Sequence, residues 1–396
     1  MRTILNISSL IVWMGLCLVP LGAEGNPEQL DSLKALFEEP HEPKEEIFWY
    51  NEMAFYLKTI NPVLGISFAD SALKKAQVVH DTVGEARSYY TMGVLNFYLG
   101  DLGKAADFLY SAERLGELGK DSLGLGRTYN NLGLVMEEDG EDSLASIFYQ
   151  KSFELREKIG DREGMIYSLI SLGNTYLKLK KRTLALSNYQ YALQIAQDIE
   201  DEKAMAFIYE ALSQLYLGQN NLEIARNELE TALQIREKLK NSYFIAMDKM
   251  RLGENYLELD NRREAEKQIL VSIAMSEKIP ARRLQLEGIE LLAELHARSG
   301  DFERAHQFLK EASTLKDEIY TEERANGLQQ IKARMDLRLK EKEIELLSRQ
   351  RENYQLRNFS LIALLLGVLL IGGLTTVFFL LRIQRRHNLN LVTKIE

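Results

Sequence analysis

The residues best suited to chemistry in this chain are its histidines and its single cysteine. The sequence of 396 residues contains five histidines, and His296 and His306 lie close together on either side of a predicted turn. Histidine is a frequent metal ligand, but a metal site needs further ligands, and Glu294 alone adds weak support. We therefore expect these histidines to lie on the surface, and we predict no metal site.

No other catalytic pattern occurs in the sequence. Cys17 lies in the apolar N-terminal stretch, so the rest of the chain has no thiol for catalysis, for a disulfide or for a thiolate metal site. The sequence lacks a glycine-rich phosphate loop, an HExxH pair and a Gly-x-Ser-x-Gly elbow. We predict no catalytic residues and no cofactor, and hence a protein that is not an enzyme.

The composition indicates a helix-rich globular chain. Hydrophobic residues make up 46% and charged residues 27% of the sequence, which contains only six prolines. The net charge is −9, and no clustered basic stretch suggests a nucleic-acid surface. We therefore predict no nucleic-acid partner.

The elements that would position a site belong to an internal repeat. Residues 168–192 predict two short helices folded back on each other, with small residues at Gly173 and Ala185 where the helices must approach closely. Both positions recur with a period of 40 residues. The first position is occupied by Met53, Gly93, Gly133, Gly173, Ser213, Gly253 and Ala293, and the second by Gly65, Ala105, Ala145, Ala185, Ala225, Ala265 and Ala305. Leucine or methionine precedes the first position throughout, except at Glu52, so one supersecondary unit repeats along the chain.

Large and small residues at these spacings resemble the tetratricopeptide repeat (TPR), with Leu172, Gly173 and Tyr176 in one helix and Ala185 and Tyr189 in the next. The resemblance implies an all-α fold, a right-handed α-α superhelix of about seven 40-residue TPR hairpins over residues 45–315. The long repeat is similar to those of spindle-orientation adaptors and bacterial Rap-type regulators, which bind peptides or proteins.

The resemblance also implies where a partner would bind, because the first helices of TPR hairpins line a concave face. The side chains expected in this partner-binding groove are Tyr90, Phe97, Asn130, Asn131, Asn174, Gln214, Glu254 and Glu294. Amide groups both donate and accept hydrogen bonds, so they suit the backbone of an extended peptide. We expect a protein or peptide partner with basic residues toward the later repeats, and no recognition of a free C-terminal carboxylate, because a full carboxylate-clamp set is missing. Ordinary solvated helix faces are the alternative.

The first 25 residues predict a signal peptide. Arg2 precedes an apolar run over residues 10–21, and small residues then favour cleavage after Ala23 or Gly25. An uncleaved anchor is the alternative, and lipid attachment at Cys17 is not expected because the bulky Leu16 precedes it. Residues 26–44 would form an N-terminal segment before exported repeats.

Two helical segments are predicted after the repeats. Residues 316–358 are rich in charged residues with a narrow apolar seam, which predicts a long helix that is a coiled-coil candidate or packs on the last repeat. Residues 359–381 contain no charged residue and as a helix would span roughly 35 Å, enough for a bilayer core of ~30 Å. We predict one transmembrane helix there and a short cytoplasmic tail at 382–396.

This layout resembles the exported TPR input half of bacterial membrane-bound sensor kinases and regulators. It predicts a non-enzymatic, membrane-anchored protein that binds a protein or peptide in the cell envelope and transmits or scaffolds a signal across the membrane. A truncated input segment of a two-component sensor histidine kinase or transcriptional regulator is one alternative, although His387 lacks the acidic residue that usually follows a phosphoacceptor. A structural adaptor of an envelope complex is the other. We expect a single-pass protein of the bacterial inner membrane with a periplasmic TPR domain, a cytoplasmic C-terminus and a possible homodimer through the charged helix.

Overall fold

The computed structural model describes residues 42–392, apart from residue 280, and every regular element in this part of the chain is an α-helix. The helices are α3 (Pro43–Tyr56), α4 (Pro62–Val78), α5 (Thr82–Tyr98), α6 (Leu102–Gly119), α7 (Ser122–Glu138), α8 (Asp142–Ile159), α9 (Arg162–Lys178), α10 (Arg182–Asp198), α11 (Glu202–Leu217), α12 (Leu222–Lys238), α13 (Ser242–Glu258), α14 (Arg262–Ser276), α15 (Arg282–Arg298) and α16 (Phe302–Val392). The predicted signal peptide lies outside the described residues, as does almost all of the predicted N-terminal segment.

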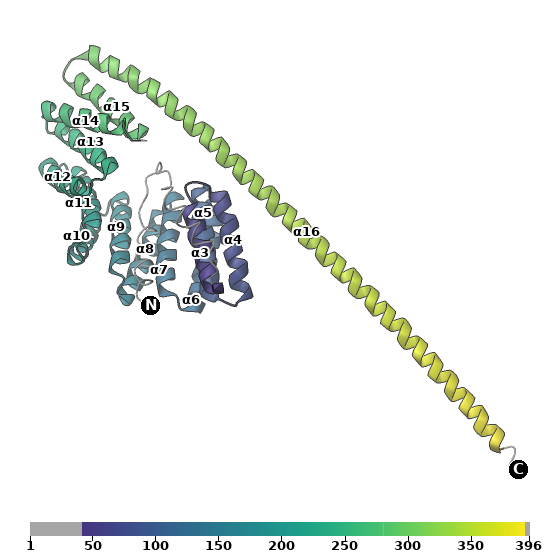
Figure 1. Ribbon diagram of the computed structural model, residues 1–396. Helices are drawn as coiled ribbons and strands as arrows, with labels where there is room; N and C mark the ends of the chain where they lie inside the picture. The colour runs from purple at the N-terminus through teal and green to yellow at the C-terminus, as the bar shows by residue number, and fades with distance from the viewer. Residues whose placement is uncertain (1–41, 280, 393–396) are drawn as a thin grey trace. The chain divides into compact units, whose positions relative to one another are not determined.

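Consecutive helices pair as hairpins, which lie side by side in chain order (Figure 1). From α5 onward, the first helix of each hairpin begins 40 residues after the previous first helix, and the second helices from α4 to α16 follow the same period. The prediction of an all-α chain built from repeated helical hairpins is therefore confirmed.

A residue in the left-handed conformation ends almost every helix of the array. These residues recur at intervals of 20, and they are Gly100, Gly140, Gly160 and Gly300 together with His80, Lys120, Lys180, Glu200, Asn220, Lys240 and Asp260. The next residue is often Asp or Asn, and its side chain accepts a hydrogen bond from the first turn of the following helix, as Asp121 does from Gly124 N–H at 2.9 Å. A residue in the left-handed conformation ends one helix, and the Asp or Asn that follows caps the start of the next helix, so the chain reverses within a short connection.

The small residues of the repeat allow the two helices of a hairpin to touch. The alanines at the second small position, from Ala105 to Ala265, are completely buried. A Cβ on Gly133 would lie 2.5 Å from Cε1 of Tyr149, closer than real Cβ contacts occur. Glycine is therefore needed where the tyrosine ring of the second helix crosses the first.

The first helices form one layer of the array. Adjacent first helices contact each other in the pairs α3 with α5, α5 with α7, α7 with α9, α9 with α11, and α13 with α15, whereas no consecutive pair of second helices approaches as closely among the described residues. Ion pairs also join this layer, since Lys178 Nζ lies 2.5 Å from Glu137 Oε1 and Arg298 lies 2.8 Å from Glu258. An array whose first helices are closer together than its second helices curves with the first helices on the inside.

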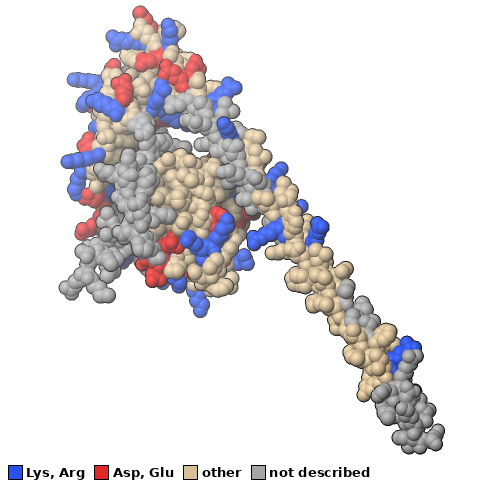
Figure 2. All heavy atoms as spheres, turned by 45° about the vertical axis from the view of Figure 1, so that its right-hand side comes forward, with Lys and Arg blue, Asp and Glu red and all other residues tan. Residues whose placement is uncertain are grey.

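Residues 331–396 form a second compact unit, which the structure describes to residue 392 as part of α16. The predicted charged segment at 316–358 is helical, and Met335, Leu339, Leu347 and Tyr354 of its apolar seam are exposed. Homodimer formation through this seam stays a prediction. The apolar side chains that follow appear in Figure 2 as uncharged surface along this unit.

Among the described residues, no helix is long and apolar enough to cross a membrane. Several side chains between residues 359 and 381 are not among those that the structure describes, so the transmembrane helix predicted there stays a prediction. The predicted tail at 382–396 lies partly outside the described residues.

Candidate partner-binding groove

The eight residues predicted for the groove lie on six consecutive first helices. Tyr90 and Phe97 belong to α5, Asn130 and Asn131 to α7, Asn174 to α9, Gln214 to α11, Glu254 to α13 and Glu294 to α15. These first helices form the inner layer of the array, in which most adjacent pairs contact each other. Their contacts divide them into three groups.

The first group joins α5 to α7. Asn131 Nδ2 donates to the hydroxyl of Tyr90 at 3.1 Å and to the backbone oxygen of Arg127 at 3.0 Å. Burial raises the pKa of the Tyr90 hydroxyl, which therefore stays protonated. Phe97 packs on the apolar cluster around Leu109 and Leu132, so it belongs partly to the core.

The second group consists of the middle amides. Asn174 is exposed, and its Oδ1 accepts a hydrogen bond of 2.6 Å from the hydroxyl of Tyr189. Asn130 Oδ1 is buried and has no hydrogen-bond partner among the described residues. When the amide of Gln214 is turned so that its oxygen faces Arg251, this oxygen accepts from Nη1 at 3.0 Å and Nη2 at 3.3 Å. Neighbouring side chains therefore orient Asn174 and Gln214, and of the three amides only that of Asn174 is exposed.

The third group is acidic, and its charge is partly neutralised within the chain. Glu294 is exposed but lies 2.5 Å from Arg298, which also pairs with Glu258. Glu254 is exposed and forms no ion pair with the residues that the structure describes. Of the two predicted carboxylates, Glu254 is therefore the more available to a basic partner.

A buried ionic cluster lies behind the middle of the groove, and the sequence interpretation missed it. Arg236 of α12 is hydrogen-bonded to Asp248 of α13 and to Glu210 of α11, the latter at 2.6 Å. The guanidinium carbon lies 5.1 Å from the ring centre of Phe207 and 4.7 Å from that of Phe244. Burial raises the pKa of Asp248 to about 7, with the Glu210 charge adding to the effect and Arg236 opposing it. The cluster joins three helices and lies mostly out of a partner's reach.

A periodic signal for this cluster was present in the sequence. Counting in steps of 40 from Gly116, the same position holds Arg156, Ala196, Arg236 and Ser276. Arginine at a position otherwise occupied by small residues indicates a buried cation that needs its own partners. Arg156 is 1% exposed and donates to the backbone oxygen of Gly164 at 2.6 Å.

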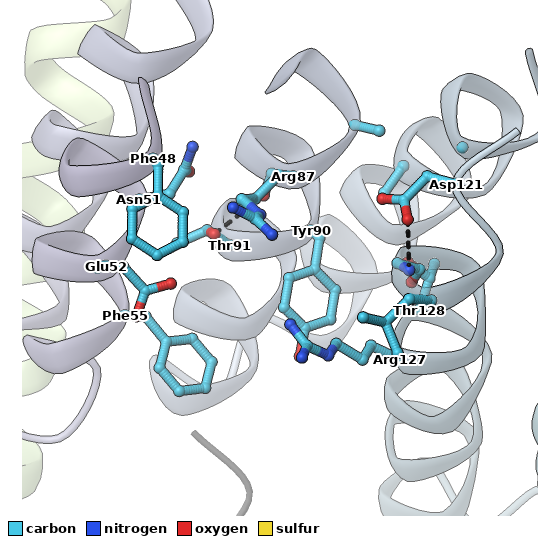
Figure 3. Close-up of a pocket in the computed structure, with 15 residues that line it drawn as sticks. Phe48, Asn51, Glu52, Phe55, Arg87, Tyr90, Thr91, Asp121, Arg127 and Thr128 are labelled. Carbon is cyan, nitrogen blue, oxygen red and sulfur yellow. Dashed lines mark hydrogen bonds between the residues drawn. The ribbon is translucent and has the colours of Figure 1, made fainter. Parts of the chain in front are cut away.

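The inner face is hollowed at its N-terminal end by a pocket of about 140 Å³ between α3, α5 and α7 (Figure 3). Its wall is partly aromatic and partly charged. Among the residues that line it are Phe48, Asn51, Glu52 and Phe55 of α3, Arg87, Tyr90 and Thr91 of α5, and Arg127 and Thr128 of α7.

Two arginines and one glutamate dominate the electrostatics of this pocket. Burial raises the pKa of the Glu52 carboxyl, and the charges of Arg87, Arg127 and Lys58 oppose that rise. The guanidinium of Arg87 lies 5.0 Å from the ring centre of Phe48. The sequence signal was Glu52 itself, the charged exception at an otherwise apolar repeat position.

Asn51 adds an unpartnered acceptor to the same pocket. Its side chain is 1% exposed, and Nδ2 donates to Ile47 O at 2.9 Å and to Ser88 Oγ at 3.1 Å. Its Oδ1 has no hydrogen-bond partner among the described residues. A buried acceptor without a partner costs free energy, which a ligand N–H group would recover.

The histidines behave differently from the expectation of surface positions. His306 is exposed, but His296 is 6% exposed, so the surface prediction is wrong for this residue. Its ring stacks on Phe308 with centroids 5.4 Å apart, because the second helix of the last hairpin lies over it. Within the part of the chain that the structure describes, no group of His, Cys, Asp and Glu side chains could hold a metal ion.

Comparison with known proteins finds a family model for part of the repeat. A family model described as Tetratricopeptide repeat matches residues 164–238, the region around Gly173 from which the period was counted. No curated protein matches the chain.

Solved structures share the fold at low sequence identity. A signal transduction ATPase with numerous domains, which has a tetratricopeptide repeat sensor and comes from Pyrococcus horikoshii, is 20% identical with a TM-score of 0.60, and the match covers 73% of this chain and 44% of that chain. The apo form of RapI is 14% identical with a TM-score of 0.56 over 70% of this chain and 99% of that chain. BtubC from P. vanneervenii is 21% identical with a TM-score of 0.50 over 54% of this chain and 90% of that chain. The helical hairpins are therefore like those of a TPR superhelix, a fold that typically serves as a non-catalytic scaffold for protein–protein interaction.

Proposed function

We propose that the inner face of the first helices binds an extended segment of a partner protein, and that the chain acts through this binding as a non-enzymatic scaffold. The observation that carries the proposal is that Asn174, Gln214 and Glu254 occupy the same repeat position on three consecutive first helices, with Asn131 three residues before that position on the preceding first helix. Polar side chains repeated at the spacing of the hairpins present hydrogen-bonding groups along a line, which is the form that an extended backbone can follow.

The charges at the two ends of this line predict in which orientation the partner segment binds. Arg87 and Arg127 lie in the pocket at the N-terminal end, whereas Glu254 and Glu290 are exposed at the C-terminal end and form no ion pair with described residues. A segment with basic residues toward α13 and α15 would be complementary to this end. Glu294 is already paired with Arg298. We therefore expect the basic residues of the partner to contact Glu254 of α13 and Glu290, which lies one turn before Glu294 in α15.

We propose in addition that residues 359–381 anchor the scaffold in a membrane. The stretch contains no charged residue. Its large side chains are exposed, including Phe359 at 78% and Leu369 at 70%, and a contiguous apolar surface of this kind requires a cover of lipid or protein. Transmission of a signal across that membrane and dimerisation through Met335 to Tyr354 remain part of the same proposal. Partition of the chain into a carbonate-resistant membrane fraction, lost when 359–381 is deleted, would support the anchor, and recovery of the whole chain in the soluble fraction would contradict it.

Affinity capture with the whole chain tests the groove. The variant Asn131→Ala, Asn174→Ala, Glu254→Ala should lose at least about nine tenths of the captured partner, because each change removes a hydrogen bond or charge worth about 1 kcal/mol or more. The matched control is Asn188→Ala, Asn227→Ala, Glu303→Ala, which removes the same chemical groups from second helices, where Asn188 is half-buried and the other two are exposed. Equal recovery with both triple variants would contradict binding at the inner face, provided that their unfolding midpoints agree.

A further inference from the structure

The pocket between α3, α5 and α7 contains charges that the repeat does not require. Arg87 and Arg127 occupy the same position of consecutive hairpins, and the later hairpins have Tyr167, Phe207, Met247 and Glu287 there. Hairpins therefore form without a cation at this position. The two arginines are a local feature of the N-terminal end of the groove.

The geometry of the pocket brings these cations toward one space. The guanidinium groups of Arg87 and Arg127 and the carboxyl of Glu52 extend from three helices into the region beside Tyr90 (Figure 3). Neither arginine forms an ion pair within 4.0 Å with a residue that the structure describes. Two half-buried guanidinium groups without a close anion would gain charge-assisted hydrogen bonds from a ligand carboxylate.

We propose that this pocket receives an aspartate or glutamate side chain of the extended partner segment, with its carboxylate between Arg87 and Arg127. This inference rests on the proposed function, since it assigns one contact of the same partner. The rings of Phe48, Phe55 and Tyr90 would cover the methylene groups of the side chain, and Asn51 Oδ1 would accept a hydrogen bond from a ligand N–H group. The volume of about 140 Å³ is well above the ~10–15 Å³ that one water molecule requires.

We assign the pocket to an acidic side chain rather than to a free chain terminus. Polar groups continue from the pocket with Asn131 on α7 and Asn174 on α9. A segment that follows this line reaches the pocket at the N-terminal end of the groove, and a segment that continues past α3 presents a side chain, not its end, to the arginines. With Glu254 at the far end, the groove favours a segment that is acidic near α3 to α7 and basic near α13.

Glu52 acts in this arrangement as an internal competitor. Its carboxyl faces Arg87 and Arg127 together with Lys58 and the hydroxyl of Tyr90. When ionised it attracts the same guanidinium groups and repels an incoming carboxylate, so its removal should strengthen binding. Glu52→Gln keeps the shape of the side chain and removes the charge.

The test measures binding of fluorescent peptides to the whole purified chain in detergent by fluorescence anisotropy. Three pools of nonapeptides, blocked at both ends and randomised over Ala, Leu, Tyr, Asn and Lys, carry Glu, Gln or Lys at the central position. A fourth pool has Gln at the centre and a free C-terminal carboxylate. The Glu pool should bind at least about tenfold more tightly than the Gln pool, the factor expected for one charge-assisted contact.

Single substitutions locate the contact. Arg87→Gln and Arg127→Gln should each remove most of the preference for Glu, and Glu52→Gln should increase the affinity for the Glu pool. Arg114→Gln is the matched control, because Arg114 is exposed on the second helix α6 in the same part of the array. It should retain the wild-type preference.

The results distinguish the acidic side-chain contact in the pocket from binding of a segment along the groove. Equal binding of the Glu and Gln pools would overturn the acidic side chain but leave the groove intact. Tighter binding of the fourth pool would assign the arginines to a chain terminus instead, and a preference unchanged in both Arg87→Gln and Arg127→Gln would place the contact elsewhere. Failure of all pools to bind would contradict the groove itself.

Discussion

The ring of Tyr189 lies against Gly173 so closely that a Cβ on the glycine would fall 2.3 Å from Cε1 of the ring. The hydroxyl of the same tyrosine donates to Asn174 Oδ1 at 2.6 Å. One side chain of the second helix α10 thus fills the space beside the small residue of α9 and orients an amide on the inner face. Packing within the hairpin and the position of a groove residue are set by the same contact.

Because of this contact, we expect that a single methyl group added at Gly173 lowers the stability of the chain strongly. Gly173→Ala should destabilise the chain by about 2 kcal/mol or more, because the ring cannot move without disturbing a completely buried neighbourhood. The control is Gly103→Ala in α6, where an added Cβ meets nothing within 4 Å. It should stabilise the helix by roughly 0.5–1 kcal/mol. Urea unfolding followed by circular dichroism measures both, and equal midpoints would contradict the close approach.

The left-handed turns predict stability changes of opposite sign. Gly140 has φ of 84° with nothing within 4 Å of an added Cβ, so Gly140→Ala should cost about 1 kcal/mol from backbone conformation alone. Lys180 adopts φ of 59° at the equivalent turn of the next hairpin, so Lys180→Gly should be neutral or stabilising by up to about 1 kcal/mol. Lys180→Ala serves as the control for loss of the side chain. A destabilising Lys180→Gly with a harmless Lys180→Ala would show that backbone strain is not the determinant.

Arg156 and Gly126 should be energetically coupled. A Cβ on Gly126 would lie 3.1 Å from Cγ and Nε of the buried Arg156 side chain. Gly126→Ala should therefore destabilise the natural chain by about 1–3 kcal/mol but should be tolerated when combined with Arg156→Ala, which empties that space. A double-mutant cycle of unfolding free energies measures the coupling, and additive effects would contradict the contact.

Asp248 should make stability depend on pH. Burial raises its pKa from 3.8 to about 7, so the folded chain binds a proton there that the unfolded chain releases between these values. This contribution is present below pH 3.8 and is lost as the pH rises toward 7. At 1.36 kcal/mol per pKa unit the loss is at most about 4 kcal/mol, and the nearby Arg236 reduces it.

Asp248→Asn should remove this component of the pH profile, measured as unfolding midpoints between pH 4 and pH 8. Asp260→Asn is the control, because Asp260 is exposed and its side chain pairs only with Arg262 among the described residues. A profile unchanged by Asp248→Asn would show that Asp248 is ionised throughout this range.

The hairpins were predictable from sequence because each one requires small residues at the same two positions. Gly173 and Ala185 mark the closest approach of two helices, and this steric requirement returns every 40 residues. The turns are local in the same sense, because a left-handed residue and the Asp or Asn cap that follows it are neighbours in sequence. The resemblance to TPR arrays then placed the groove residues on the first helices, where the structure has them.

The pocket and the ionic cluster were not predictable in the same way. Arg127 on an amphipathic helix is indistinguishable in sequence from a solvated cation, and only the packing of three hairpins brings it toward Glu52. The hydrogen bond from the Asn131 amide to Tyr90 of the previous hairpin was also not predictable, and contact of Asn131 with a peptide stays a prediction. His296 was expected on the surface, but the next helix covers it with Phe308. In each case, contacts between different helices determine the surroundings of the side chain.

Site-specific photo-cross-linking in living cells can show whether the inner face of the first helices holds the partner. A benzophenone amino acid is placed at Glu254 on α13 or, as the control, at Arg263 on α14, since both side chains are exposed and lie on neighbouring helices of one hairpin. We expect a distinct partner protein to be cross-linked from Glu254 and not from Arg263. Cross-linking of that partner from Arg263 with none from Glu254 would contradict binding at the inner face.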